Sequence, residues 1–408
     1  MSEFKEFSLL ESIIDRVTLK GYKQPTPIQK ECIPALINGN DLLGIAQTGT
    51  GKTAAFSLPI INNFGRNKID IQAKSTRSLI LTPTRELASQ IMQNIDDYSE
   101  GLELKTKVVY GGVGRQAQVD SIALGLDILV ATPGRLLDLI ETGDINFKAL
   151  EVFVLDEADT MLDMGFFKDV QTIISKLPKN RQTLLFSATM PAEIEILAEA
   201  ILTDPIKIQV AAETVTIDLV NQSVYHLDKA NKVPLLFNIL QKPEFEKVLI
   251  FCKTKYGADI IVKALEKASI TAASLHSSKT QAVREEALQN FKDSNLRVLV
   301  ATDVAARGID VNNITLVINY NLPEDPRNYI HRIGRTARAG KSGMAISFAV
   351  ENDMRQLINI ENSIGQVIPI VTEQPFHKEF SKLPKEVKKK VSKTNKTNRT
   401  NSTRKKRK

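Results

Sequence analysis

The feature that most constrains the fold is a regular alternation of short apolar runs with amphipathic stretches along most of the chain. The runs are rich in β-branched residues or Leu, which is typical of strands buried on both faces of a parallel sheet. Helical patterns such as Glu86–Tyr98 and Arg135–Ile140 lie between them. Because strands alternating with helices indicate right-handed βαβ units, the sequence predicts two α/β domains. The predicted strands are Leu42–Ala46, Ser78–Thr82, Lys107–Tyr110, Asp127–Ala131, Val152–Asp156 and Thr183–Ser187, then Val248–Cys252, Thr271–Leu275, Arg297–Ala301, Leu316–Asn319 and Met344–Ala349.

The domain boundaries follow from composition. The stretch Val210–Asp218 lacks a clear period and follows Asp204-Pro205, so we expect a linker there, between a first domain at 1–209 and a second at 219–372. Beyond Thr372 the apolar content collapses, which predicts a disordered tail over 373–408.

The positive charge of the chain lies in this tail. Residues 385–408 contain twelve Lys or Arg and one acid, which leaves 42 basic and 46 acidic residues in 1–384. A solvated tail is the simplest reading of such a charge run, but a basic tail that binds nucleic acid non-specifically, and in a salt-dependent way, is the stronger expectation.

Composition also excludes several classes of protein. Cys32 and Cys252 are too few for a disulfide framework or a Cys-rich zinc site, which favours a reducing, cytoplasmic setting. No apolar stretch approaches the roughly 18 residues of a membrane-spanning helix. The first twelve residues lack the basic and apolar regions of a secretory signal. We therefore expect no association with a membrane.

The strongest local pattern is a glycine-rich turn between a predicted strand and a helical stretch, the context of a phosphate-binding P-loop. Glycines let backbone N–H groups converge on phosphate oxygens, and the helix N-terminus adds a favourable dipole. Lys52 can reach the β- and γ-phosphates of a nucleoside triphosphate, and the Thr53 hydroxyl can ligate Mg²⁺. The motif consists of Ala46, Gln47, Thr48, Gly49, Thr50, Gly51, Lys52 and Thr53, with Ala46 where the first glycine is usual.

An acidic cluster supplies the partner that a P-loop requires. The apolar strand from Val152 ends in Asp156-Glu157-Ala158-Asp159. Asp156 at the strand tip suits Mg²⁺, directly or through water. Glu157 is placed to take a proton from the attacking water.

With this cluster the sequence resembles the DEAD-box ATP-dependent RNA helicases, and ordered motifs extend the resemblance over roughly residues 4–370. It implies two tandem RecA-like parallel-sheet domains, ATP and Mg²⁺ as ligands, and RNA as the partner. It also implies that Gln29 hydrogen-bonds the adenine edge while Phe4 packs near the base. Arg335 and Arg338 are implied as arginine fingers for the γ-phosphate, and Asp310 as a contact to the ribose. The residues implied to couple hydrolysis to RNA binding are Asp159, Ser187, Thr189 and His331.

The same resemblance implies a set of contacts to the RNA backbone from both domains. Arginine, hydroxyl and backbone N–H groups are the donors that phosphates and 2′-hydroxyl groups require, so low sequence selectivity is expected. In the first domain these residues are Pro83, Thr84, Arg85, Gly112, Thr132 and Arg135. In the second domain they are Lys253, Thr254, Gln281, Arg284, Thr302 and Arg307.

Departures from the family pattern are few. Ala337 stands where glycine is frequent, and His276-Ser277-Ser278 replaces a common His-Gly pair. The pattern from His276 to Gln281 is most similar to the bacterial RhlE-type subgroup.

Together these features predict RNA-stimulated ATP hydrolysis, domain closure and local strand separation. The alternatives are an ATP-gated RNA clamp with low turnover and a DNA helicase of the same superfamily. Ribosomal or RNA-decay proteins are candidate partners, and we expect a monomer.

Overall fold

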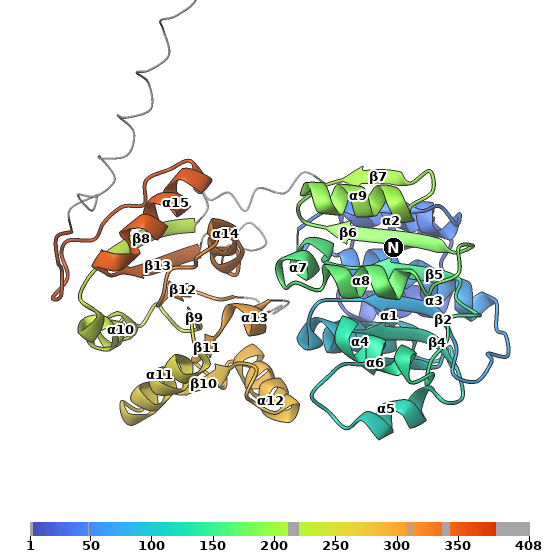
Figure 1. The fold of residues 1–408 in the computed structure, drawn as a ribbon, viewed down its shortest axis with the longest axis horizontal. Helices are drawn as coiled ribbons and strands as arrows, with labels where there is room; N and C mark the ends of the chain where they lie inside the picture. The colour runs from blue at the N-terminus through green and yellow to red at the C-terminus, as the bar shows by residue number, and fades with distance from the viewer. Residues whose placement is uncertain are drawn as a thin grey trace, which may run out of the picture.

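The structure is a computed structural model that describes residues 3–47, 49–210, 220–307, 311, 313–336 and 343–380. It contains two α/β domains that lie side by side (Figure 1). The first has a seven-stranded sheet in the order β3-β4-β2-β5-β6-β1-β7, and the second a six-stranded sheet in the order β10-β11-β9-β12-β13-β8. All pairings between named strands are parallel. The predicted fold class, two tandem RecA-like domains, is confirmed.

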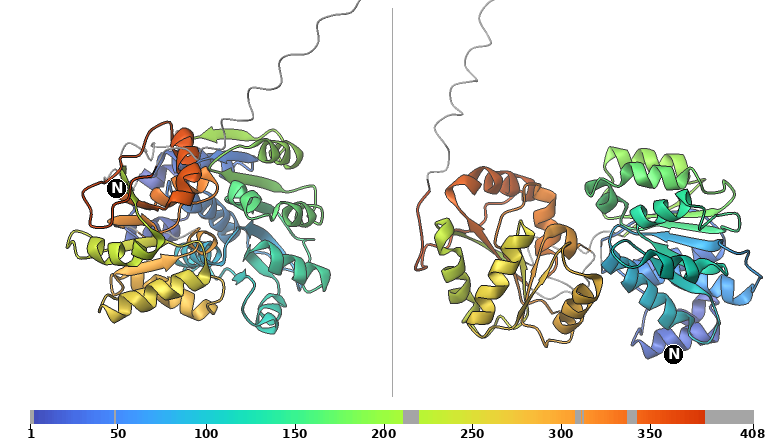
Figure 2. Two further views of the ribbon diagram at one scale, coloured as in Figure 1. Left: turned by 60° about the vertical axis from the view of Figure 1, so that its left-hand side comes forward. Right: turned by 60° about the horizontal axis from the view of Figure 1, so that its bottom comes forward.

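The first domain carries helices on both faces of its sheet (Figure 2). Its strands are β1 (Leu42–Ile45), β2 (Thr76–Leu81), β3 (Thr106–Val109), β4 (Leu126–Ala131), β5 (Val152–Leu155), β6 (Gln182–Ser187) and β7 (Ile206–Gln209). Its helices are the 3-10 turn η1 (Glu3–Phe7), α1 (Glu11–Leu19), α2 (Pro27–Ile37), α3 (Lys52–Arg66), α4 (Arg85–Ser99), α5 (Arg115–Ile122), α6 (Pro133–Glu141), α7 (Ala158–Asp163), α8 (Phe167–Ile174) and α9 (Ala192–Ile201).

The second domain repeats this plan. Its strands are β8 (Val220–His226), β9 (Val248–Phe251), β10 (Ala272–Leu275), β11 (Val298–Ala301), β12 (Leu316–Asn319) and β13 (Gly343–Ala349). Its helices are η3 (Lys229–Asn231), α10 (Lys232–Leu240), α11 (Lys255–Lys267), α12 (Gln281–Lys292), α13 (Asp303–Ala306), α14 (Pro326–Ile333), η4 (Glu351–Asp353) and α15 (Met354–Ile364). None of the helices in the described residues is long and apolar enough to cross a membrane.

Alternation of side chains along the strands builds two apolar layers on each sheet. In β5, Val152 and Val154 join the core on one face, whereas Phe153 and Leu155 join the core on the other. Because both faces are covered, the central strands read as continuous apolar runs in the sequence. This is why the predicted central strands lie within two residues of the observed ones.

Two strands were not predicted, and both lie at sheet edges. β7 exposes three of its four residues, and β8 alternates buried with more exposed positions. In these two strands exposed residues interrupt the apolar run, whereas the other two edge strands, β3 and β10, were predicted.

The C-terminal segment differs from the expected tail. Residues 370–380, named here the C-terminal strap, follow α15 and run along β8. Val371 N–H donates to Val224 O at 2.9 Å and Lys378 N–H to His226 O at 3.1 Å, while Phe376 packs on the core. The packed chain therefore extends to 380, beyond the expected boundary at 372. The rest of the tail and most of the expected linker lie outside the described residues.

The strand order also divides the functional motifs. The P-loop follows β1, the acidic cluster follows β5, and β6 with Ser187 at its end lies between them. The segments implied to bind RNA follow β3, β4 and β2, on the other half of the same sheet. In α/β sheets ligands bind beyond the carboxyl ends of the strands. The carboxyl ends of this sheet therefore carry two neighbouring groups of motifs, one around the P-loop and one implied to bind RNA.

Candidate functional site

The P-loop of the first domain is held in a shape that only glycine adopts easily. Gly49 and Gly51 have φ angles of +88° and +93°, in the left-handed region. Thr50 Oγ1 donates to Gln47 O at 2.9 Å, and the buried Lys52 donates from Nζ to Ala46 O at 2.7 Å. The loop is thus held by hydrogen bonds within itself at the start of α3, and one of them is donated by the Lys52 ammonium group. Thr48 lies outside the described residues.

The two residues implied to read adenine are both buried. Gln29 accepts at Oε1 from Thr26 N–H at 2.9 Å and donates from Nε2 to Gly51 O at 3.1 Å. A Cβ on Gly51 would lie 2.5 Å from Gln29 Nε2, so glycine is required where the two segments meet. In this structure the Gln29 amide therefore braces the P-loop. Phe4 is fully buried in the core of the first domain.

The acidic cluster after β5 lies close to Lys52 and is almost completely buried. Burial raises the pKa of Asp156 to about 7; Lys52 opposes this shift and the Glu157 carboxylate adds to it. Asp156 Oδ1 accepts from Glu157 N–H at 3.0 Å. A buried carboxylate with one nearby cation favours further positive charge, so Asp156 fits as an oxygen ligand that would hold a hard divalent cation. Among the described residues no group of three or more His, Cys, Asp or Glu side chains could hold a metal alone.

The end of β6 is bonded to the acidic cluster. Asp159 Oδ2 accepts from Thr189 N–H and from Thr189 Oγ1, both at 2.9 Å. Asp159 N–H donates to Ser187 Oγ at 3.3 Å, and Ser187 Oγ donates to Thr189 O at 2.7 Å. The structure thus brings together Asp159, Ser187 and Thr189, and their hydrogen bonds join the two segments.

The segments of the first domain implied to bind RNA begin helices. Thr84, after Pro83, caps α4 by accepting from Leu87 N–H at 3.2 Å, and Thr132 occupies the cap position of α6. The Arg85 guanidinium lies directly over Gly112, where an added Cβ would be 2.0 Å from Nη1. Arg135 is braced inside the domain: its Nη1 donates to Gln118 Oε1 at 2.8 Å.

The corresponding residues of the second domain repeat this geometry. Thr254 caps α11 by accepting from Gly257 N–H at 3.0 Å, and Thr302 precedes α13. Lys253 is exposed and pairs with Glu324 at 2.7 Å. Gln281 is buried at the start of α12, where its Nε2 donates to Glu285 Oε1 at 2.8 Å.

Two contacts join the implied RNA surfaces of the domains. Arg284 Nη2 lies 2.6 Å from Glu86 Oε1, and both side chains are more than nine-tenths buried. Tyr110 Oη donates to Glu285 Oε1 at 3.2 Å. Arg284 also approaches Arg85, and burial together with this like charge lowers the pKa of Arg85. Positive charge from both domains therefore converges at one place.

A second group of contacts joins the domains beside the acidic cluster. Asp163, at the end of α7, lies 3.7 Å from Arg307 and 3.4 Å from Arg327. Burial lowers the pKa of His331, and Asp159 of the other domain opposes this shift. A cavity of about 600 Å³ opens here, lined by Asp163 and Glu193 on one side and Asp303 and Arg307 on the other.

The arginine-rich helix α14 is anchored to its own domain. Arg332 makes a two-pronged pair with Asp303, at 2.5 Å and 2.7 Å, and also donates to Asn319 Oδ1 at 3.0 Å. Arg335 follows as a mostly buried side chain. Arg338 and Asp310, implied to contact the γ-phosphate and the ribose, lie outside the described residues.

Comparison with known proteins decides the family. Residues 26–197 match the family model of the DEAD/DEAH box helicases, and residues 231–340 match the helicase conserved C-terminal domain. The chain is 42% identical over 363 residues to the ATP-dependent RNA helicase CshA of Listeria monocytogenes, covering 89% of this chain and 69% of that protein. The chain belongs to the DEAD-box ATP-dependent RNA helicases. It is an ATPase that binds ATP and RNA.

Two solved structures show different degrees of similarity to the chain. Dbp5 of S. cerevisiae bound to RNA and ADP BeF3 has a TM-score of 0.78 at 29% identity, covering 91% of this chain and 96% of that one. A DEAD box protein from Methanococcus jannaschii has a TM-score of 0.53 at 38% identity, covering 90% and 98%. This helicase thus resembles the RNA-bound structure more in shape although less in sequence.

Several residues of the helicase site carried no signal in the sequence. Asp163 and Arg327 form an ion pair between the domains, but in the sequence a single charged residue on a helix predicts only a side chain that faces water. Gln118 is buried between two segments that the resemblance implies to bind RNA, and only its spacing from Gly111-Gly112 points to this position. Glu86 lies inside a recognised segment, but its partner Arg284 is about 200 residues away in sequence.

Proposed function

We propose that this helicase couples ATP hydrolysis to closure of its two domains on a single RNA strand, and that closure locally separates a short duplex. The observation that carries the proposal is that the interdomain contacts come from the functional segments themselves. Arg284 meets Glu86 where the RNA surfaces join, and Arg307 meets Asp163 beside the acidic cluster. RNA and ATP would therefore stabilise the same closed arrangement.

In the nucleotide site, Lys52 would leave Ala46 O to bind the β- and γ-phosphates, while Glu157 would accept the proton of the attacking water. Thr53 and Asp156 fit as the residues that hold Mg²⁺, which would neutralise phosphate charge when bound. Gln29 would contact the adenine after releasing part of its P-loop brace. Arg335 and Arg338 would approach the γ-phosphate from the second domain.

On the RNA side, hydroxyl groups and helix N-termini from both domains would bind one continuous stretch of sugar-phosphate backbone. The helices α4, α6, α11 and α12 each begin directly after a Thr at the cap position. Their N-termini favour anions because of the helix dipole. Backbone contacts of this kind imply little sequence selectivity.

The similarity to the RNA-bound Dbp5 structure supports this proposal. Its higher TM-score, at lower identity, supports a domain arrangement close to one that holds RNA and ADP BeF3. We infer that the described arrangement corresponds to a closed or nearly closed state.

The test is phosphate release from ATP and Mg²⁺, measured alone, with single-stranded RNA and with DNA of equal length. We expect strong stimulation by RNA and little by DNA. ATP-dependent RNA binding without stimulation would favour the clamp, and equal stimulation by DNA would favour a DNA helicase.

We further propose a bacterial cytoplasmic setting, because the curated relative is bacterial. The similarity to a CshA protein does not single out the RhlE-type subgroup, so that subgroup stays a prediction. Action as a monomer and contact with ribosomal or RNA-decay proteins are likewise predictions. The basic tail, with its excess of Lys and Arg in 385–408, would add non-specific RNA affinity.

A further inference from the structure

The loop between β3 and α5 carries Gly112, one of the residues that would contact RNA. Gly112 has a φ of +86°, and the Arg85 guanidinium lies directly over it. The loop follows a short edge strand, so one side of it has no neighbouring strand to hold it. Its conformation must therefore depend on side chains that reach its carbonyl groups.

Two side chains do so. Gln118, on α5, donates from Nε2 to Tyr110 O at 3.1 Å, at the start of the loop. Arg135, on α6, donates from Nη2 to Val113 O at 3.3 Å, near its end. The loop is therefore held at both ends, by residues from two different helices.

The two side chains that hold the loop, Gln118 and Arg135, are also hydrogen-bonded to each other. It is mostly buried, and its Oε1 accepts from Arg135 Nη1 at 2.8 Å while its Nε2 holds Tyr110 O. An amide offers a donor and an acceptor at once, which neither a carboxylate nor an apolar side chain provides. One side chain thus fixes the loop to the helix that carries Thr132 and Arg135.

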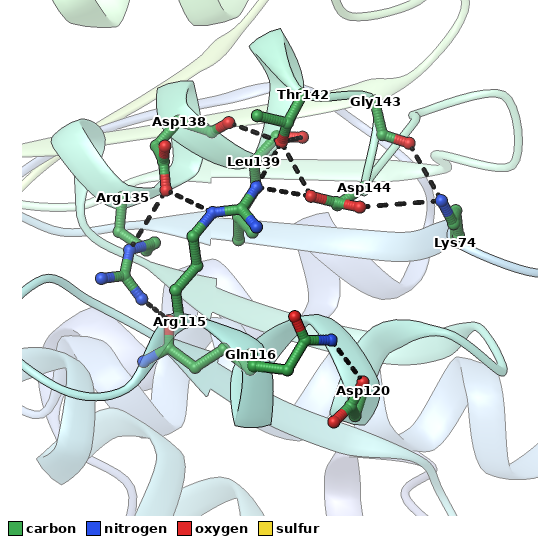
Figure 3. A network of polar contacts seen from close by, with 11 residues as sticks. Lys74, Arg115, Gln116, Asp120, Arg135, Asp138, Leu139, Thr142, Gly143 and Asp144 are labelled. Carbon is green, nitrogen blue, oxygen red and sulfur yellow. Dashed lines mark hydrogen bonds and ion pairs between the residues drawn. The ribbon is translucent and has the colours of Figure 1, made fainter.

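A surrounding polar network fixes the orientation of Arg135 (Figure 3). Asp138 lies 3.6 Å from Arg135 Nε and 3.0 Å from Arg115 Nε, and Arg115 also pairs with Asp144 at 2.5 Å. In the same view Gln116 points away from Arg135 and donates to Asp120 at 2.8 Å. Helix α5 therefore carries one glutamine that bonds Arg135, Gln118, and one that does not, Gln116.

We propose that Gln118 is a positioning residue for RNA binding, which sets the Gly112 loop and Arg135 in one arrangement that fits the RNA backbone. The inference rests on the proposed function, because it takes Arg85, Gly112 and Thr132 as the RNA-contacting surface. Gln118 itself touches no reacting atom. It acts through the loop and through Arg135.

The test compares Gln118→Met and Gln118→Glu with Gln116→Met, using full-length protein. Met has similar length and loses both hydrogen bonds. Glu keeps the acceptor for Arg135 but turns an oxygen toward Tyr110 O, so it removes the hydrogen bond to the loop alone. A purely structural role would lower the melting temperature of both variants and leave the half-saturating RNA concentration of the folded protein unchanged. The readouts are the RNA concentration that half-saturates ATPase activity, kcat at saturating RNA, the melting temperature, and hydrogen exchange of amides 111–114 without RNA.

We expect both Gln118 variants to raise the half-saturating RNA concentration about tenfold, the equivalent of one to two hydrogen bonds. Amide exchange in the loop should accelerate by a similar factor, while kcat at saturating RNA stays within about twofold. Gln116→Met should match the wild type in all readouts. Should Gln118→Met fail to fold, Gln118→Glu carries the test alone.

Two outcomes overturn the inference while leaving the proposed function intact. Either loop exchange is unchanged in both Gln118 variants, or exchange accelerates while the half-saturating RNA concentration stays at the wild-type value. In both cases Arg85→Ala should still weaken RNA stimulation. If Arg85→Ala also leaves it unchanged, the RNA-contacting surface is wrong, and the inference falls together with that part of the proposed function.

Discussion

Glu157 is held in a conformation that residues other than glycine rarely adopt. Its φ is 54°, in the left-handed region, and the side chain is buried. The hydrogen bond from its N–H to Asp156 Oδ1 helps to maintain this geometry. Strain of this kind is found where a side chain must be aimed for chemistry, which agrees with its proposed role as the base.

Replacing this base tests the role directly. Glu157→Gln keeps the shape and removes the proton acceptor, so turnover should fall at least about a hundredfold while ATP and RNA binding persist. Steady-state phosphate release and RNA binding with ATP measure the two effects. Glu195→Gln, on the exposed face of α9, is the matched control and should behave as the wild type. Retained turnover in Glu157→Gln would remove Glu157 as the base.

At this scale the sequence predicts best where a motif is contiguous. Lys52 was predicted from the contiguous glycine-rich motif, and Asp156 and Glu157 because they directly follow an apolar strand. Gln118 and Asp163 were not, because their importance comes from partners that folding brings near them. A single polar residue on a helix has the same appearance in sequence whether it faces water or a buried partner.

Among the elements, prediction succeeded for the strands covered on both faces and for the edge strands β3 and β10, and it failed for the edge strands β7 and β8. β5 and β9 are fully buried and were predicted. β7 and β8 are not, so their sequences lack the continuous apolar run. The C-terminal strap was missed for a similar reason. Its polar sequence attaches through backbone hydrogen bonds and a few aromatic side chains, which composition does not reveal.

The strap gives a prediction with an internal control. Ending the chain after 372 removes the contacts of Gln374 and Lys378 with His226 O and the packing of Phe376 and Phe380. We expect the free energy of unfolding to fall by about 2 kcal/mol, which corresponds to a melting temperature lower by about 5 °C. Thermal unfolding measures it.

The control is a chain that ends after 380, which removes the basic tail and keeps the strap. Its melting temperature should equal that of the full chain, while its RNA affinity should be lower and less dependent on salt. Equal melting temperatures for the chains ending at 372 and 380 would contradict a stabilising role for the strap.

At the scale of the whole molecule, the two domains meet through contacts that no local sequence pattern could predict. The pair Arg284–Glu86 is buried, and burial raises the pKa of Glu86 although Arg284 opposes this. Removing one partner of a buried pair leaves the other without compensation, so the domains should close less readily.

A double-mutant cycle measures this coupling. Arg284→Met and Glu86→Gln should each raise the half-saturating RNA concentration about tenfold, and the double variant should be little worse than either. The exposed pair Lys68–Glu103 within the first domain is the control, where the two substitutions should have almost no effect. Full additivity at Arg284 and Glu86 would show that the pair does not act as a unit.

The most direct test of the central claim is reciprocal coupling between the two ligands. RNA affinity is measured with and without a non-hydrolysable ATP analogue and Mg²⁺, and analogue affinity with and without RNA. If both ligands favour one closed arrangement, each should tighten the other by the same factor, about tenfold or more. If each affinity is unchanged by the other ligand, ATP and RNA do not share a closed state, and the proposed coupling does not exist.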